Sequence, residues 1–212
     1  MKYDDLRANL AGREPGILDG DQVRKYAILV PLVEKEDGLH VLFEVRSSRM
    51  RKQPGDVCFP GGRIEQDDST EEKAAIRETI EELGILAAEI GDVYPLDYLV
   101  GDIHVYPFAG RLLFPDRIQV NPDEVEEIFT VPLNYLLEKE PIVHYVDLLP
   151  TPAADFPYEW IQGGVGYQWR PRKTPQLFYL YEDRVIWGLT AQILHHFLQL
   201  IRHPKPSSLQ GD

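Results

Sequence analysis

A short acidic segment constrains the fold of this chain more than any other part of its sequence. Apolar residues recur there at i, i+4 and i+7, the spacing that places side chains on one face of a helix. These residues are Ile76, Ile80 and Leu83. Ser69 and Glu72 fit a capping box at the start, and Gly84 lies where a left-handed residue commonly ends a helix. The sequence therefore predicts a helix over residues 70–83 that packs along this stripe.

Strand and helix signals are distributed over the rest of the chain. Apolar and β-branched runs predict strands at residues 26–33, 39–46, 92–100, 105–113 and 127–131. A turn at Asp37-Gly38 joins the first two strands into a hairpin. Further helices are predicted at residues 3–10, 133–137 and 187–201. Residues 149–175 are rich in proline, glycine and aromatic residues and give no clear prediction.

The chain is expected to form one domain. Its 212 residues, 43% of them hydrophobic and 27% charged, can bury a substantial core. Neither an internal repeat nor a composition break divides them. We therefore expect a single domain over residues 1–212, with residues 1–24 as an N-terminal extension and residues 203–212 as a tail that frays.

The charge balance argues against some partners. A formal net charge of −13 gives little support for a sequence-independent grip on nucleic acid, and an anionic membrane surface would repel the chain. No apolar run approaches the ~20 residues of a membrane span, and the first residues lack the apolar core of a signal peptide. With Cys58 as the single cysteine, no intrachain disulfide forms. We expect a cytoplasmic protein that binds neither nucleic acid nor membrane.

Carboxylates crowd the end of the predicted helix. Residues three and four apart are neighbours on a helix, so Glu78 faces both Glu81 and Glu82. Each like-charge pair costs an isolated helix roughly 0.2–0.5 kcal/mol. One interpretation is a solvated acidic face, partly neutralised by Arg77 four residues before Glu81. The other is a site for a hard cation such as Mg²⁺ or Mn²⁺, which takes carboxylate oxygens and leaves positions for substrate phosphates.

The surrounding residues favour the cation. Phe59-Pro60-Gly61-Gly62 leads into the helix through a turn whose glycines let main-chain groups approach a ligand closely. After it comes the run Arg77-Glu78-Thr79-Ile80-Glu81-Glu82-Leu83-Gly84-Ile85, which resembles the signature of the Nudix hydrolases. All five fixed positions of that part of the signature are present, and Thr79 stands where an aliphatic residue is usual.

The loop before the helix departs from the general Nudix pattern. Gly62 and Arg77 lie 15 positions apart, one more than the signature has. Counting back from Arg77 places Ser69 in the slot of the signature's remaining glutamate, and counting forward from Gly62 places Asp68 there. Neither residue can be assigned that glutamate's role from the sequence.

An extra signature before the glycine pair resembles that of one subgroup, the coenzyme A diphosphatases. The chain reads LFEVRSSRMRKQPGDVCFPGG from Leu42 to Gly62, with the Arg, Ser, Arg, Gly and Phe-Pro-Gly-Gly positions in register. Phe43 and Glu44 depart from the signature's Leu and Thr. The resemblance extends over residues 26–200 and implies an α/β fold, an α/β/α sandwich with a mixed β-sheet.

The same resemblance implies hydrolysis of a diphosphate by water with the help of Mg²⁺ or Mn²⁺. Glu78 and Glu82 are the first choices as metal ligands, with Glu81 next. Arg77 is expected to orient neighbouring carboxylates, and Glu124 is the first candidate for a general base, ahead of Glu126 and Glu127. Coenzyme A as substrate would give 3′-phospho-AMP and 4′-phosphopantetheine.

A dense cationic cluster in an otherwise acidic chain supplies candidate phosphate contacts. The predicted substrate-binding residues are Arg46, Arg51, Lys52, Phe59, Gly61 and Gly62, and Arg49 belongs to the same cluster. The alternative is a basic loop that pairs with nearby acids.

Two other functions stay open at this point. A Nudix diphosphatase acting on ADP-ribose or another nucleoside diphosphate derivative would not need the arginine-rich signature. A catalytically silent module that senses a nucleotide would not need Glu78, Glu81 and Glu82, all of which are present. The sequence also leaves a homodimer open.

Overall fold

The computed structural model describes residues 2–14, 16–18, 20 and 22–203 of the chain. Its centre is a pair of long parallel strands, β1 (Arg24–Lys35) and β7 (Ile103–Leu112). Both are rich in apolar residues, as is usual for strands covered on both faces. The strands predicted at residues 26–33 and 105–113 are confirmed. Apart from residue 203, the predicted tail lies outside the described residues.

The main sheet is mixed, because its other strands pair antiparallel. β2 (Gly38–Arg46) follows the predicted turn and pairs with β1 and with β8 (Val125–Pro132). β5 (Ile90–Pro95) and β6 (Leu99–Val100) pair with β7, while β3 (Val57–Cys58) and β4 (Gly61–Arg63) add short ladders to β2 and β1. The single strand predicted at residues 92–100 was wrong, since the chain forms two strands there and the first ends at Pro95, which has no N–H to donate.

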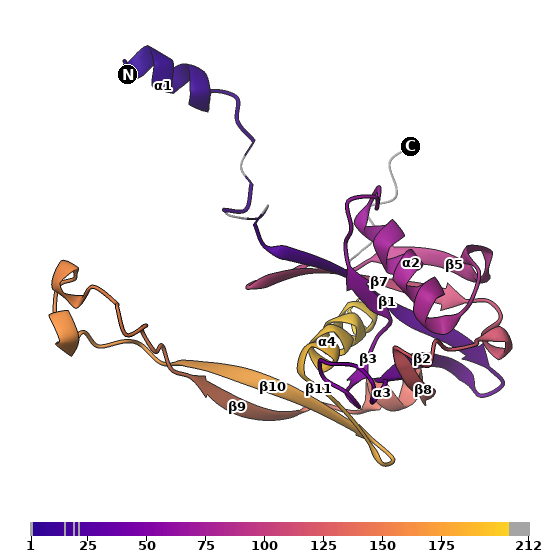
Figure 1. Cartoon of the computed structure of the whole chain (residues 1–212). Helices are drawn as coiled ribbons and strands as arrows, with labels where there is room; N and C mark the ends of the chain where they lie inside the picture. Colours follow the sequence, from indigo (N-terminus) through magenta and orange to yellow (C-terminus); the bar gives the residue numbers. More distant parts are fainter. Residues whose placement is uncertain (1, 15, 19, 21, 204–212) are drawn as a thin grey trace.

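Helices cover both faces of this sheet (Figure 1). Alternate β1 residues serve opposite faces: Ala27 and Leu29 pack with Ala74 and Ala75 of α2 (Glu71–Leu83). Val30 joins a core cluster with apolar residues of α4 (Gly188–Arg202), including Ile193, Leu194 and Phe197. This two-residue alternation lets one strand contribute to two cores. The predicted α/β/α sandwich is confirmed.

The acidic helix forms as expected, but its cap and buried face differ from the prediction. Thr70 is the N-cap, and its Oγ1 accepts a hydrogen bond from the Lys73 N–H at 3.2 Å, so the predicted Ser69 capping box was wrong. Gly84 adopts the predicted left-handed conformation. The buried face consists of Ala74, Ala75, Thr79, Glu82 and Leu83, with Ile76 and Ile80 only half-buried. Small residues are selected on this face because the helix lies close to the sheet.

A second sheet lies beyond the sandwich and was not predicted. β9 (Ile142–Leu148), β10 (Arg172–Tyr181) and β11 (Arg184–Trp187) pair antiparallel, and residues 149–171 form the far end of this arm (Figure 1). β11 leads directly into α4, so the arm fixes where that helix begins. The short helices α1 (Tyr3–Leu10) and α3 (Leu133–Glu138) confirm the predictions there, and α4 confirms the last helix with its start at Gly188.

In the described part of the chain, every helix is too short or too polar to cross a membrane.

Candidate active site

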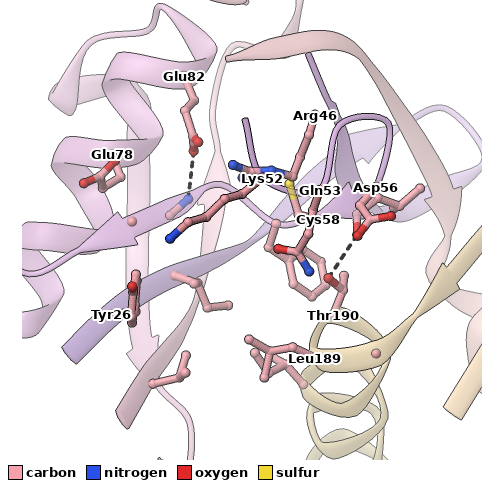
Figure 2. Close-up of a pocket in the computed structure, with 18 of the residues that line it drawn as sticks. Tyr26, Arg46, Lys52, Gln53, Asp56, Cys58, Glu78, Glu82, Leu189 and Thr190 are labelled. Atoms are coloured by element: carbon pink, nitrogen blue, oxygen red, sulfur yellow. Dashed lines mark hydrogen bonds between the residues drawn. The ribbon is translucent and has the colours of Figure 1, made fainter. Parts of the chain in front are cut away.

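A pocket of about 620 Å³ opens where α2, the loop after β2 and the start of α4 meet (Figure 2). Its lining comes from distant parts of the sequence: residues 26–28, 46–63, 78–82, 103–105, 124 and 187–193. Of the predicted metal ligands, Glu78 and Glu82 line it, whereas Glu81 does not. Among the predicted substrate contacts, Arg46, Lys52, Phe59, Gly61 and Gly62 line it, whereas Arg51 does not.

Two carboxylates form the acidic side of the pocket, Glu82 buried and Glu78 half-buried. Glu82 is 4% exposed, and its Oε2 accepts a hydrogen bond from the Gly61 N–H at 2.8 Å. Burial raises the pKa of Glu82 to about 8, against the lowering effect of that hydrogen bond. Burial also raises the pKa of Glu78, although Arg77 Nη1 donates to its Oε1 at 2.8 Å. No hydrogen bond from a described residue reaches the second oxygen of either carboxylate.

The glycine pair is required by close contacts rather than by the turn alone. A Cβ atom at Gly62 would lie 2.3 Å from the Glu78 Cδ. Gly61 has a φ of +153°, and a Cβ there would lie 2.5 Å from the carbonyl oxygen of Ala27. Gly62 therefore lets β4 lie directly against the Glu78 carboxylate, and Gly61 lets it lie closely against β1.

Glu44 is a residue of the site that the sequence analysis missed. It lies on β2 beside Cys58 of β3, is fully buried, and has no hydrogen-bond partner for its Oε1 among the described residues. Burial and the nearby Glu82 raise its pKa well above the ordinary value. A charged residue inside the apolar run of residues 39–46 was the available signal. In the sequence, Glu44 stands out only as a departure from the signature's Thr.

Arg77 forms hydrogen bonds to three carboxylates on the acidic side of the pocket. Its Nε and Nη2 donate to both oxygens of Asp68 at 3.0 and 2.9 Å, and its Nη1 donates to Glu78 and, at 3.3 Å, to Glu81. Arg77 Nη2 also donates to the carbonyl oxygen of Arg63 at 3.1 Å. The hydrogen bonds from Arg77 hold the pKa of Asp68 below its usual range. The insertion in the signature thus places Asp68, not Ser69, against Arg77.

Two cationic side chains, Arg46 at the end of β2 and Lys52 in the loop after it, line the same pocket as the acids. Arg46 and Lys52 face the pocket, and Figure 2 shows Lys52 between Glu82 and Leu189. The buried Nε of Arg46 has no hydrogen-bond partner among the described residues. Arg49 instead pairs with Asp123 at 2.9 Å, outside the pocket. Of the four cations in residues 46–52, Arg46 and Lys52 therefore line the pocket.

Buried Ser47 anchors this loop to the segment that carries Glu124. Its Oγ donates to the Pro122 carbonyl oxygen at 2.9 Å and its N–H donates to the Glu124 carbonyl oxygen at 2.8 Å. Glu124 consequently lines the pocket. The other two base candidates lie outside it, because Glu126 accepts hydrogen bonds from Ser48 and Glu127 from Arg184.

Cys58 lines the pocket but is not an activated nucleophile. Burial and the nearby Glu44 raise the pKa of its thiol to about 12. The thiolate is the nucleophilic form of cysteine, and it is disfavoured here.

The donor set fits a cation held jointly with substrate. Among the described residues, no three His, Cys, Asp or Glu side chains converge into a complete metal site. Mg²⁺ is commonly held by one or two carboxylates together with water and substrate phosphates, so two carboxylates in an open pocket suit it. The oxygens of Glu78 and Glu82 that accept no hydrogen bond from a described residue are available to bind such a cation.

Comparison with known proteins identifies the family of this chain. The NUDIX domain family matches residues 23–148. Peroxisomal coenzyme A diphosphatase NUDT7 of Mus musculus is 35% identical over 156 residues, covering 72% of this chain and 65% of that protein's length. Uncharacterized Nudix hydrolase NudL of Yersinia pestis (strain Pestoides F) is 32% identical over 183 residues, covering 84% of this chain and 80% of that protein.

A solved structure, that of the C. elegans Ap4A hydrolase, is 21% identical, with a TM-score of 0.43. The matched region covers 55% of this chain and 85% of that one. The family match spans more than half of the chain and includes the glycine pair and the acidic helix. The chain therefore belongs to the Nudix hydrolase family.

Proposed function

We propose that this protein hydrolyses the diphosphate bond of coenzyme A or its derivatives, releasing 3′-phospho-AMP and 4′-phosphopantetheine. One observation carries the proposal: two carboxylates, the half-buried Glu78 and the buried Glu82, line one pocket together with Arg46 and Lys52. A diphosphate bound with a divalent cation satisfies both sides, because the cation neutralises the carboxylates and the phosphates pair with the basic side chains. The likeness to a coenzyme A diphosphatase supports the choice of substrate.

Each residue of the site has a distinct role in this proposal. Glu78 and Glu82 would hold Mg²⁺ or Mn²⁺, which supplies Lewis-acid stabilisation of the charge that develops on the phosphate oxygens. Arg46, through its unpaired Nε, and Lys52 bind and orient the diphosphate. Arg77 positions Glu78.

Hydrolysis itself needs a base and an in-line water. The water oxygen bonds to one phosphorus while the bond from that phosphorus to the bridging oxygen breaks, and the bridging oxygen leaves with the other phosphate. Glu124 lines the same pocket and is the proposed acceptor of the proton that the water loses. Glu81 is held by Arg77 at the exposed end of the network and remains a predicted third ligand.

Product analysis tests this substrate assignment. Purified protein is incubated with coenzyme A, ADP-ribose or NADH, each with Mg²⁺, Mn²⁺ or a chelator, and the products are identified by liquid chromatography and mass spectrometry. We expect cation-dependent release of 3′-phospho-AMP from coenzyme A at a higher kcat/KM than the cleavage of the other two. Turnover of ADP-ribose without cleavage of coenzyme A would contradict the proposal.

Location and assembly remain predictions. We predicted a cytoplasmic protein, while the mouse relative is named as peroxisomal, so imaging of the tagged protein in its own cells is the relevant check. A homodimer is tested by light scattering of the purified chain.

A further inference from the structure

The pocket has two halves of different chemistry. Around α2 and the loop after β2 it is lined by charged side chains, those of Glu78, Glu82, Arg46 and Lys52. Toward β1, β7 and α4 it is lined by aliphatic side chains: Ile28, Ile103, Val105, Leu189 and Ile193. Figure 2 shows Leu189 on the side of the pocket opposite Glu82. A ligand that fills this pocket therefore needs a charged part and an uncharged part.

The aliphatic wall is part of the rigid fold. Leu189 and Ile193 are i, i+4 neighbours on the first turns of α4, and Ile193 belongs to the core cluster. The Thr190 Oγ1 donates to the Val57 carbonyl oxygen at 3.0 Å, which fastens the start of α4 to β3 (Figure 2). The opposing residues, Ile28, Ile103 and Val105, come from the central parallel strands. The wall is therefore preformed rather than assembled on binding.

We infer that this wall binds the pantetheine half of coenzyme A, which gives the substrate one orientation in the pocket. The inference rests on the proposed function. Pantetheine is uncharged and carries a geminal dimethyl group, whereas the adenosine half carries a 3′-phosphate. Placing that phosphate against five aliphatic side chains would leave a charge desolvated and unpaired, which is costly. The 3′-phosphoadenosine half therefore extends toward the cationic loop after β2, where Lys52 lines the pocket and Arg51 is exposed.

Leu189 is the best position for a test, because it is 39% exposed and its replacement leaves the core intact. Leu189→Gln removes apolar contact without adding a charge that would repel the diphosphate. Leu189→Met keeps the contact. Ile201→Gln is the matched control, since Ile201 lies on the same helix, is also 39% exposed and is outside the pocket.

The readout is inhibition of coenzyme A cleavage by each product. We expect Leu189→Gln to weaken inhibition by 4′-phosphopantetheine about three- to ten-fold and to raise KM for coenzyme A to a similar degree. Inhibition by adenosine 3′,5′-bisphosphate should change less than about two-fold. Leu189→Met and Ile201→Gln should behave like the wild-type protein.

Three results would overturn the inference alone while coenzyme A is still cleaved: equal weakening for both products, weakening for the adenosine product only, or no change for either. No inhibition of the wild-type protein by 4′-phosphopantetheine would also overturn it. Failure of the wild-type protein to cleave coenzyme A overturns the proposed function itself. The wild-type assay alone gives that result, so the two failures are distinguishable.

Discussion

At the scale of single residues, the site is built on a cluster of acids that folding alone does not favour. Glu44 and Glu82 are both buried, and burial raises the pKa of each. The fold therefore favours the protonated form of these groups, or their neutralisation by a bound cation, over the bare carboxylates. Glu44 lies behind Glu82 and does not line the pocket, so its contribution is to the charge balance.

This arrangement predicts a stability that falls as pH rises when no divalent cation is present. A carboxyl whose pKa is raised on folding binds a proton in the folded state that the unfolded state has already released. The contribution of such a group to stability is fully present below pH 4.5, the ordinary pKa of a glutamate carboxyl, and is lost as the pH rises through the folded-state pKa. Each such group lowers the free energy of unfolding by at most about 1.4 kcal/mol per pH unit.

Glu44→Gln should make this decline shallower, because one of the two buried acids is gone. Urea unfolding in the presence of a chelator, between about pH 5 and about pH 8, measures how the free energy of unfolding changes with pH. Glu72→Gln, on the same helix as Glu82, is the control. Identical pH dependence of wild type and Glu44→Gln would show that Glu44 does not hold a proton in the folded state.

Gly62→Ala should separate activity from stability. The added Cβ would meet the end of the Glu78 side chain, which can swing away, so the fold should be retained. Misplacing this carboxylate should lower kcat/KM for coenzyme A by about ten- to 100-fold. Gly166→Ala is the control, since a Cβ there meets no atom within 4 Å. Wild-type activity in Gly62→Ala would refute a role for the position of Glu78.

Much of the site was predictable from local spacing, and the remainder was not. Glu78, Glu82 and the glycine pair follow from fixed distances along the sequence, and the structure brings them together. Glu44 was missed because its role depends on its closeness to Glu82, which is a tertiary relationship between β2 and α2. The same reason explains why Lys52 lines the pocket and Arg51, its neighbour in the sequence, does not.

At the scale of elements, α2 links local sequence to the site. Its start fixes which residues face the sheet, and a shift of one residue there rotates every side chain by about 100°. The predicted cap was wrong by one residue, because Ser69 and Thr70 are both good capping residues and only the approach of the chain selects between them.

Thr70→Ala should therefore destabilise the protein, whereas Ser69→Ala should not. Loss of an N-cap hydrogen bond costs about 1 kcal/mol, and this bond is made by Thr70 to the Lys73 N–H. Equilibrium unfolding in urea compares the two variants. Equal loss in both, or a larger loss in Ser69→Ala, would contradict the assigned cap.

The arm was the least predictable element. All seven residues of β9 are exposed, so the strand has no alternation of buried and exposed residues that would predict it. A proline- and glycine-rich segment separates β9 from its partner β10, so no short hairpin signal links the two strands. Their partners lie 24 to 36 residues apart in the sequence. Strand pairing over such separations depends on contacts that a local pattern does not contain.

At the scale of the whole molecule, the fold class was predictable because the acidic helix and the signature before it resemble those of a family with this fold. The pocket was not, because it joins residues 26–28 to residues 187–193 across almost the full described chain. The central β1–β7 pair makes this possible by supporting α2 on one face and α4 on the other. The charged half of the pocket then belongs to α2 and the apolar half to α4 and β7.

The most direct test of the central claim combines cation binding and catalysis in the same samples. Mn²⁺ binding is measured by calorimetry at about pH 8, and coenzyme A cleavage is then assayed, for wild type, Glu82→Gln and the control Glu72→Gln. We expect Glu82→Gln to bind Mn²⁺ more weakly and to lose on the order of 100-fold or more in rate, while Glu72→Gln retains both. Unchanged Mn²⁺ affinity together with a wild-type rate in Glu82→Gln would contradict the account.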